Sequence, residues 1–197
     1  MQSTGNNTLA NTPNTQNRPT SDYHFLTTWT VQATREEVYR ILEEVEQLAK
    51  WWPSVYLDVK VREKGQPGGI GKWVSLYTKG WLPYTLRWDF RVTAAKFPEG
   101  FSLRASGDFI GEGVWAFREA GDQCIITYDW RISAEKPILR RLSGLLRSVF
   151  SANHEWAMRK GLESLQLELR RRRGESHVPH APAPTFPHNL LRNQVFQ

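Results

Sequence analysis

The chain has 197 residues, of which 40% are hydrophobic and 23% are charged, and its formal net charge is +6. This length suits a single hydrophobic core. The only cysteine, Cys124, excludes an internal disulfide framework and a cysteine-based metal site. The sequence contains neither the run of about 18 apolar residues that a membrane helix needs nor a secretory signal pattern at its start, so we expect a cytoplasmic protein.

The two ends of the chain differ in composition from the middle. Residues 1–21 are rich in Asn, Thr, Gln and Pro, and residues 174–197 are rich in Pro and His. Such segments bury too little apolar surface to offset the entropy of ordering them. We therefore expect a disordered N-terminal tail over 1–21, a folded domain over 22–173, and a flexible C-terminal tail over 174–197 that docks weakly or not at all.

A strand and a short helix come first in the folded part. Apolar or aromatic side chains alternate with polar ones over residues 23–31, which is the period of a strand with one buried face. Thr34 and Glu37 have the spacing of a capping box at the start of a helix. That helix must end before Trp51-Trp52-Pro53, because the residue ahead of a proline is pushed out of the helical region.

Further alternating stretches predict an antiparallel meander. They cover residues 55–61, 71–79, 84–93, 101–109, 115–117 and 125–132. Short turns between them indicate that neighbours in the sequence pair with each other. Gly111 and Gly113 are expected to mark a reversal or a bulge, since glycine tolerates unusual backbone angles.

The last predicted element is a long amphipathic helix over about residues 144–173, with a shorter helical segment from Pro137 ahead of it. Its apolar stripe carries Phe150, His154 and Met158 at intervals of four residues. About thirty helical residues span about 45 Å, which is enough to cross a curved sheet. The sequence thus predicts an α+β helix-grip fold, a curved antiparallel sheet of six to seven strands wrapped around a long C-terminal helix.

Four stretches carry a resemblance to a known superfamily. They are residues 34–39 ahead of Trp51-Trp52-Pro53, residues 107–111 ahead of Trp115, residues 128–130 and residues 153–159. With the order of elements, they resemble the START-like (SRPBCC) superfamily over residues 22–173, most closely its polyketide cyclase and dehydrase-like group. The resemblance implies a deep apolar cavity between sheet and helix, with ligand specificity set by the residues that line it.

Candidate ligand-binding residues are the large side chains expected on the inner faces of the sheet and the helix. They are Trp29, Trp52, Trp88, Phe90, Leu103, Trp115, Tyr128, Trp130, Phe150, Asn153, His154 and Met158. Rigid rings around a cavity favour flat or polycyclic ligands, whereas ordinary core packing explains the same residues without a ligand. Trp51 and Trp52 either gate the cavity or plug the end of the barrel.

His154 is the main candidate for chemistry. A buried imidazole either acts on a ligand as base, acid or hydrogen-bond anchor, or is satisfied by neighbouring protein groups. Asn153 either orients this histidine and contacts a ligand or lies exposed beside the stripe. Three hypotheses remain: a binder of a hydrophobic or aromatic, lipid- or polyketide-like molecule; a polyketide cyclase or dehydratase in which His154 and Tyr128 move protons; and a membrane-surface or protein-interaction adaptor.

The adaptor hypothesis depends on the basic end of the long helix, which consists of Arg170, Arg171, Arg172 and Arg173. Cations at this position complement the helix dipole, and weak contact with an anionic membrane is the alternative. We expect no nucleic-acid partner. The sequence has no phosphate-binding glycine loop, no metal-ligand spacing and no nucleophile elbow, so neither a cofactor nor a metal is predicted.

Overall fold

The computed structural model describes residues 22–134 and 137–189. Seven strands form one antiparallel sheet in the order β1-β7-β6-β5-β4-β3-β2. They are β1 (Asp22–Val31), β2 (Tyr56–Glu63), β3 (Trp73–Lys79), β4 (Thr85–Lys96), β5 (Gly100–Gly107), β6 (Phe109–Ala120) and β7 (Gln123–Ala134). The predicted meander is therefore confirmed, and the first strand joins it by pairing with the last.

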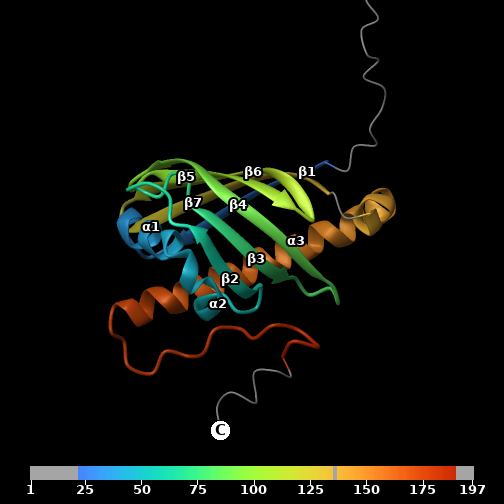
Figure 1. Ribbon diagram of the computed structural model, residues 1–197. Coiled ribbons are helices and arrows are strands. Elements are labelled where there is room, and N and C mark those ends of the chain that lie inside the picture. Colours follow the sequence, from blue (N-terminus) through green and yellow to red (C-terminus); the bar gives the residue numbers. More distant parts are fainter. Residues whose placement is uncertain (1–21, 135–136, 190–197) are drawn as a thin grey trace, which may run out of the picture.

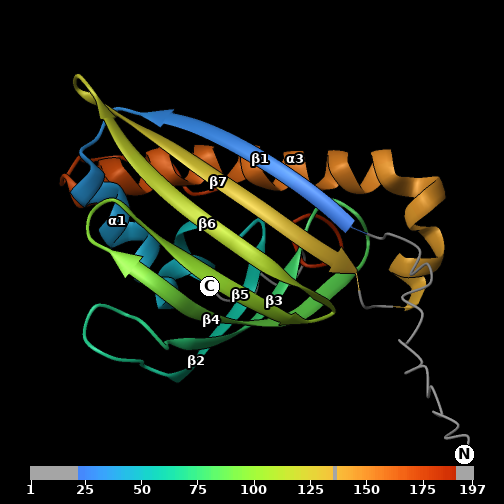
Figure 2. The same cartoon turned by 90° about the horizontal axis from the view of Figure 1, so that it is seen from above.

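Helices cover one face of the curved sheet. The long helix α3 (Pro137–Arg172) runs along this face from one end of the sheet to the other, on the side of β1 and β7, as Figures 1 and 2 show. The short helices α1 (Arg35–Glu43), η1 (Val45–Gln47) and α2 (Leu48–Trp51) lie at one end of the sheet. This arrangement confirms the predicted α+β helix-grip fold.

Local sequence explains how α1 begins and why the helical segment ends. Glu37 donates its backbone N–H to Thr34 Oγ1 at 3.2 Å, and the Glu37 carboxylate accepts the Thr34 N–H at 2.8 Å, so the predicted capping box is present. The inner face of α1 buries Val38 and Ile41 completely. The prediction of one helix that ends before Trp51 is wrong, because α1 ends at Glu43 and the separate helix α2 includes Trp51. Two residues after α2 ends, Pro53 prevents further helix.

The reversal between β5 and β6 lies at Gly107, where the backbone φ is +118°. The prediction of a reversal or bulge at Gly111 and Gly113 is wrong, because both lie in regular register inside β6. Glycine is needed there for space. A Cβ atom on Gly113 would lie 2.9 Å from Tyr128 Oη and 2.8 Å from Trp130 Cε3.

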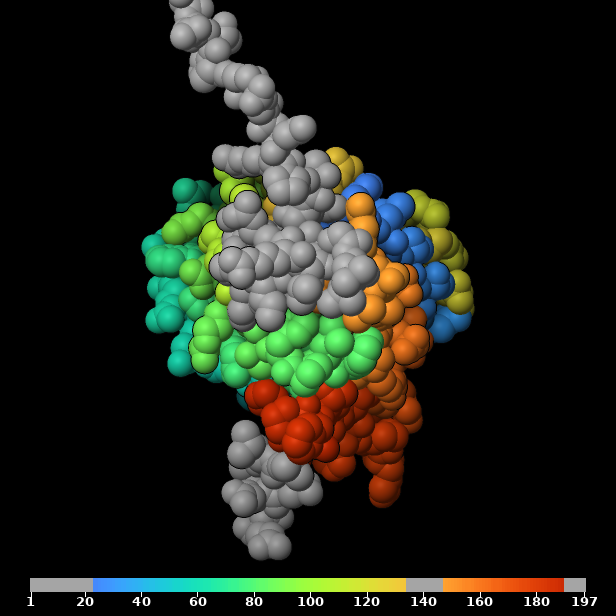
Figure 3. Space-filling view, turned by 90° about the vertical axis from the view of Figure 1, so that its right-hand side faces the viewer, coloured from blue at the N-terminus to red at the C-terminus, as the bar shows by residue number. Residues whose placement is uncertain are grey.

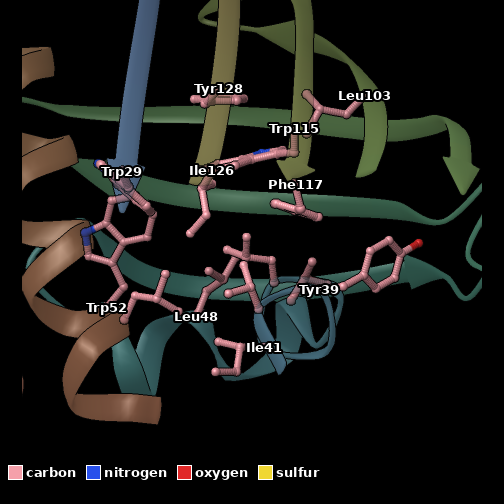
Figure 4. Packing of buried hydrophobic residues seen from close by; sticks show 14 of the residues in the cluster. Trp29, Tyr39, Ile41, Leu48, Trp52, Leu103, Trp115, Phe117, Ile126 and Tyr128 are labelled. Carbon is pink, nitrogen blue, oxygen red and sulfur yellow. The ribbon is translucent and has the colours of Figure 1, made fainter. Parts of the chain in front are cut away.

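The hydrophobic core fills the part of the concave face nearest α1 and α2. Figure 4 shows Tyr39, Ile41 and Leu48 from the short helices packed against side chains of β1, β6 and β7. The Trp29 ring lies 5.8 Å from the Trp52 ring and 5.7 Å from the Trp115 ring, measured between centroids. This half of the sheet is closed by packing, which leaves the half nearer the start of α3 for a pocket.

The C-terminal end of α3 is fixed to its surroundings. All four arginines predicted as a basic run form ion pairs: Arg170 with Glu175, Arg171 with Glu168, Arg172 with Glu44 and Glu168, and Arg173 with Glu37. Gly174 then turns the chain with a φ of +75°. Residues 175–189 return alongside α3 without helix or strand (Figure 1).

Candidate ligand-binding pocket

A pocket of about 170 Å³ lies between the sheet and the middle of α3. Phenylalanine, tyrosine and tryptophan side chains make up half of the residues that line it. Of the predicted ligand-binding residues, those that border it are Trp52, Trp88, Tyr128, Trp130, Phe150, Asn153, His154 and Met158. The others, Trp29, Phe90, Leu103 and Trp115, are buried in the core and do not border the pocket. Their contact with a ligand stays a prediction.

Several wall residues were not among the sequence-based candidates. They are Tyr23, Phe25, Val55, Tyr56, Thr78, Lys79, Gly80, Tyr84, Leu86, Phe109, Ile132 and Ala157. Alternation along β1 and β4 places Tyr23, Phe25 and Leu86 on the inner face. The sequence does not reveal which end of each strand faces the core and which faces the pocket.

His154 enters the wall from α3 with its ring stacked on Phe25, at 4.0 Å between centroids and 17° between planes. Its Nε2 atom is buried and has no hydrogen-bond partner among the described residues. Burial lowers the pKa of His154 to about 4, because an apolar environment disfavours the charged imidazolium. At neutral pH this ring is therefore uncharged, with one nitrogen able to donate a hydrogen bond and the other able to accept one.

Asn153 positions the rim of the pocket. Its Oδ1 atom accepts the backbone N–H of Leu82 at 3.1 Å. It also lies against Gly80, where a Cβ atom would collide with the Asn153 amide. Asn153 thus holds the β3–β4 connection, a role that neither of the two sequence-based interpretations included.

Tyrosine hydroxyls provide further polar groups in the wall. Burial raises the pKa of Tyr84 to about 12 and the pKa values of Tyr56 and Tyr128 well above the usual range. These phenols therefore stay protonated and neutral. The ring of Tyr128 is stacked on Trp115 at 4.0 Å, which fixes its orientation.

Two more polar groups of wall residues have no partner among the described residues. The Tyr23 hydroxyl and the Trp52 Nε1 are both buried without a hydrogen bond. By contrast, the indole N–H of Trp88 donates to Thr78 Oγ1 at 3.0 Å. With His154 Nε2, the pocket wall therefore includes three residues that have a buried polar atom without a hydrogen bond among the described residues.

Lys79 borders the pocket but directs its charge elsewhere. Side chains alternate along β3, so that Thr78 faces the pocket and Lys79 the opposite side. The Lys79 ammonium donates to the carbonyl oxygens of Thr185 and Phe186 at 3.0 and 2.9 Å. The charge of Lys79 is therefore held by residues 185–186 and does not point into the pocket.

Trp52 separates the pocket from the core. Both Trp51 and Trp52 are almost fully buried. The Trp52 indole lies against Gly161 of α3, where a Cβ atom would collide with it, and its ring lies 5.2 Å from that of Tyr56. Of the two sequence-based alternatives, this geometry favours a plug over a gate.

Over residues 22–134 and 137–189, no three His, Cys, Asp or Glu residues come together as metal ligands would. No helix in these ranges combines the length and apolar character needed to cross a bilayer.

Comparison with protein families gives one match. Residues 23–170 match the sequence profile of the family described as "Polyketide cyclase / dehydrase and lipid transport". A search of curated proteins finds no match.

Solved structures share the fold at low sequence identity. The Zhui aromatase/cyclase from Streptomyces sp. R1128 has a TM-score of 0.57 and 20% identity, covering 77% of this chain and 95% of that one. The protein TTHA0849 from Thermus thermophilus has a TM-score of 0.58 and 21% identity, covering 78% and 100%. A START superfamily protein from Mycobacterium smegmatis has a TM-score of 0.55 and 14% identity, covering 76% and 98%.

Proposed function

Because the chain belongs to the polyketide cyclase/dehydrase and lipid-transport family, we propose that it binds a neutral aromatic small molecule bearing a hydrogen-bonding oxygen. Membership confirms the family predicted from the sequence. The ligand is proposed to lie in the pocket between the sheet and α3, with its ring against the aromatic wall and its oxygen near His154.

The observation that carries this proposal is the unpartnered polar groups in an otherwise apolar wall. His154 Nε2, the Tyr23 hydroxyl and Trp52 Nε1 are buried without hydrogen bonds among the described residues. An unsatisfied buried polar group costs about 1–3 kcal/mol. A ligand oxygen that pairs with one of them, once a neighbouring side chain turns aside to admit it, recovers part of that cost. No charged group of the described wall residues points into the pocket to favour an ionic ligand.

The size of the pocket narrows the class of ligand. An apolar cavity of about 150 Å³ accommodates benzene, so the pocket of about 170 Å³ holds a single substituted ring. Pockets for drug-sized ligands reach about 300–1,000 Å³. A lipid- or polyketide-like molecule therefore fits if the rest of it extends past the rim formed by residues 80–84.

Cyclase or dehydratase-type catalysis is the second candidate, and the unpartnered Nε2 of His154 is the observation in its favour. A general base works best with a pKa near the operating pH. The pKa of His154 is about 4. For each unit by which this pKa lies below that of the substrate group, the free energy of transferring a proton from the substrate to His154 rises by about 1.4 kcal/mol. This makes His154 a better hydrogen-bond anchor than a base, so binding is the preferred function.

Two matched probes test the binding function by fluorine NMR titration. 4-Fluoroacetophenone carries a carbonyl oxygen, and 1-ethyl-4-fluorobenzene has nearly the same shape without it. We expect the ketone to bind about 2- to 12-fold more tightly, the worth of one net hydrogen bond. His154→Leu should remove this difference while the hydrocarbon still binds.

A second pair of variants tests the location. Ala157→Phe places a ring in the pocket and should weaken both probes at least about tenfold, since the lost space exceeds a methyl group several times. Glu155→Gln, an exposed change on the same helix, is the control. Absence of binding by either probe at millimolar concentration, or full binding by Ala157→Phe, would refute the proposed site.

A cytoplasmic location and a weak contact of the arginine run with anionic membranes are further parts of the proposal. The membrane contact is the less favoured part, because each of the four arginines already pairs with a carboxylate of the domain or of Glu175. Sedimentation with vesicles of phosphatidylserine and phosphatidylcholine at low salt tests it.

A further inference from the structure

The segment that follows α3 lies outside residues 23–170, the part that matches the family. Its eleven residues from 175 to 185 span about 34 Å if extended. The helix from Asn153 to Arg172 rises about 28 Å, so the segment is long enough to return to the level of Asn153. Figure 3 shows this segment, in red, directly below the green atoms of the β3–β4 region.

Contacts along its length hold the segment to the domain. Arg171 Nη2 donates to the Pro179 carbonyl at 2.9 Å, and the Ala181 side chain is buried. The Thr185 hydroxyl donates to the Gly80 carbonyl at 3.2 Å. The ring of His188 then lies 6.2 Å from that of Tyr77 on β3.

Lys79 is the strongest of these attachments. Its side chain is only 2% exposed, although lysines at strand ends usually extend their ammonium group into water. Among the described residues its ammonium is satisfied by the two successive carbonyls of Thr185 and Phe186 and by no carboxylate. A buried charge is costly unless it is well bonded, so this contact depends on the segment staying in place.

The residues held by the segment form the rim of the pocket. Gly80 and Tyr84 both border it, and Trp81 between them is 41% exposed, so the β3–β4 connection separates the pocket from solvent. Asn153 holds this connection from the helix through Leu82. Thr185 holds it from the other side through Gly80.

We infer that residues 175–189 are a strap. Lys79 and Gly80 form a recognition site for its extended backbone at residues 185–186, and occupation of this site holds the β3–β4 connection closed over the pocket. The ligand enters and leaves when the strap is released. This inference rests on the proposed function, because the strap gates exchange of the ligand that the pocket binds.

Exchange kinetics of 4-fluoroacetophenone with the full chain test the strap, using fluorine NMR line shapes and saturation transfer. Lys79→Met keeps the apolar stem and removes the ammonium. We expect its association and dissociation rates to rise together by at least about tenfold, the worth of one of the two charge-assisted hydrogen bonds that it loses. Thr185→Val, at a residue outside the pocket wall, should raise both rates by about two- to twelvefold with Kd within about twofold of the wild type. Lys72→Met is the matched control, since Lys72 Nζ also donates to a backbone carbonyl, that of Glu43 at 3.1 Å.

Amide hydrogen exchange of residues 180–189 shows independently whether Lys79→Met releases the strap. If Lys79→Met does not fold, Thr185→Val is used instead for the same measurements, because it removes only the hydroxyl bond to Gly80. If the strap is released and the exchange kinetics of the probe do not change, the inference is overturned. A changed Kd with an unchanged association rate also overturns it, because the segment would then shape the pocket without gating it. Failure of the wild type to bind the probe would instead overturn the proposed function.

Discussion

His154 should make the stability of this protein depend on pH between about 4 and 6.5. Its pKa is about 4 in the folded state and about 6.5 when unfolded. The unfolded state binds more protons in this interval. The contribution of His154 to the free energy of unfolding is therefore fully present above pH 6.5 and is lost as the pH falls towards 4. From pH 7 to pH 5 the loss attributable to His154 works out at about 2 kcal/mol, and the full shift corresponds to about 3 kcal/mol.

The assay compares wild type with His154→Phe, which keeps a ring to stack on Phe25. Urea denaturation at pH 7, 6 and 5 gives the free energy of unfolding of each protein. Carboxylates with lowered pKa, such as Glu37 and Asp129, titrate in both proteins, so their effects cancel in the difference. The variant should gain about 2 kcal/mol relative to the wild type over this range. Parallel curves would show that His154 is hydrated or hydrogen-bonded in the folded protein.

Three further predictions concern other parts of the fold. Gly113→Ala should destabilise the protein by about 1–3 kcal/mol, because the added Cβ would press on Tyr128 and Trp130; an unchanged denaturation midpoint would contradict this. Thr34→Ala removes half of the capping box and should cost about 1 kcal/mol in the same assay, whereas a loss of only a tenth of that would mean the cap is dispensable. Burial raises the pKa of Cys124 to about 11, so at pH 8 its thiol should react with Ellman's reagent only after unfolding, and rapid reaction of the native protein would count against its burial.

Local patterns were sufficient to predict the elements of this fold. Alternation in β4 and β7 and the capping box at Thr34 depend on residues close in sequence, and the structure confirms them. Gly111 and Gly113 were misinterpreted because their role is set by the neighbouring strand. A glycine that makes room for Trp130 cannot be distinguished in the sequence from one that turns the chain.

The pocket was less predictable than the fold for a similar reason. The inner face of β1 carries Phe25 and Trp29 with the same periodicity, yet Phe25 borders the pocket and Trp29 lies in the core. The difference arises because α1 and α2 cover only one end of the sheet. The sequence also did not predict the burial of Lys79, since its contact with residues 185–186 joins positions more than a hundred residues apart.

The position of Trp52 against Gly161 has a consequence for how this protein can change over time. On one side of the indole lies Trp29 of the core, and on the other lies Tyr56 of the pocket wall. Leu86 and Ile132 border the pocket and are only partly buried where they pack against the core, so substitutions there disturb the packing around Ile41 less than substitutions inside the core do. Selection, natural or in the laboratory, can therefore alter what the pocket accepts while the scaffold that carries it is conserved.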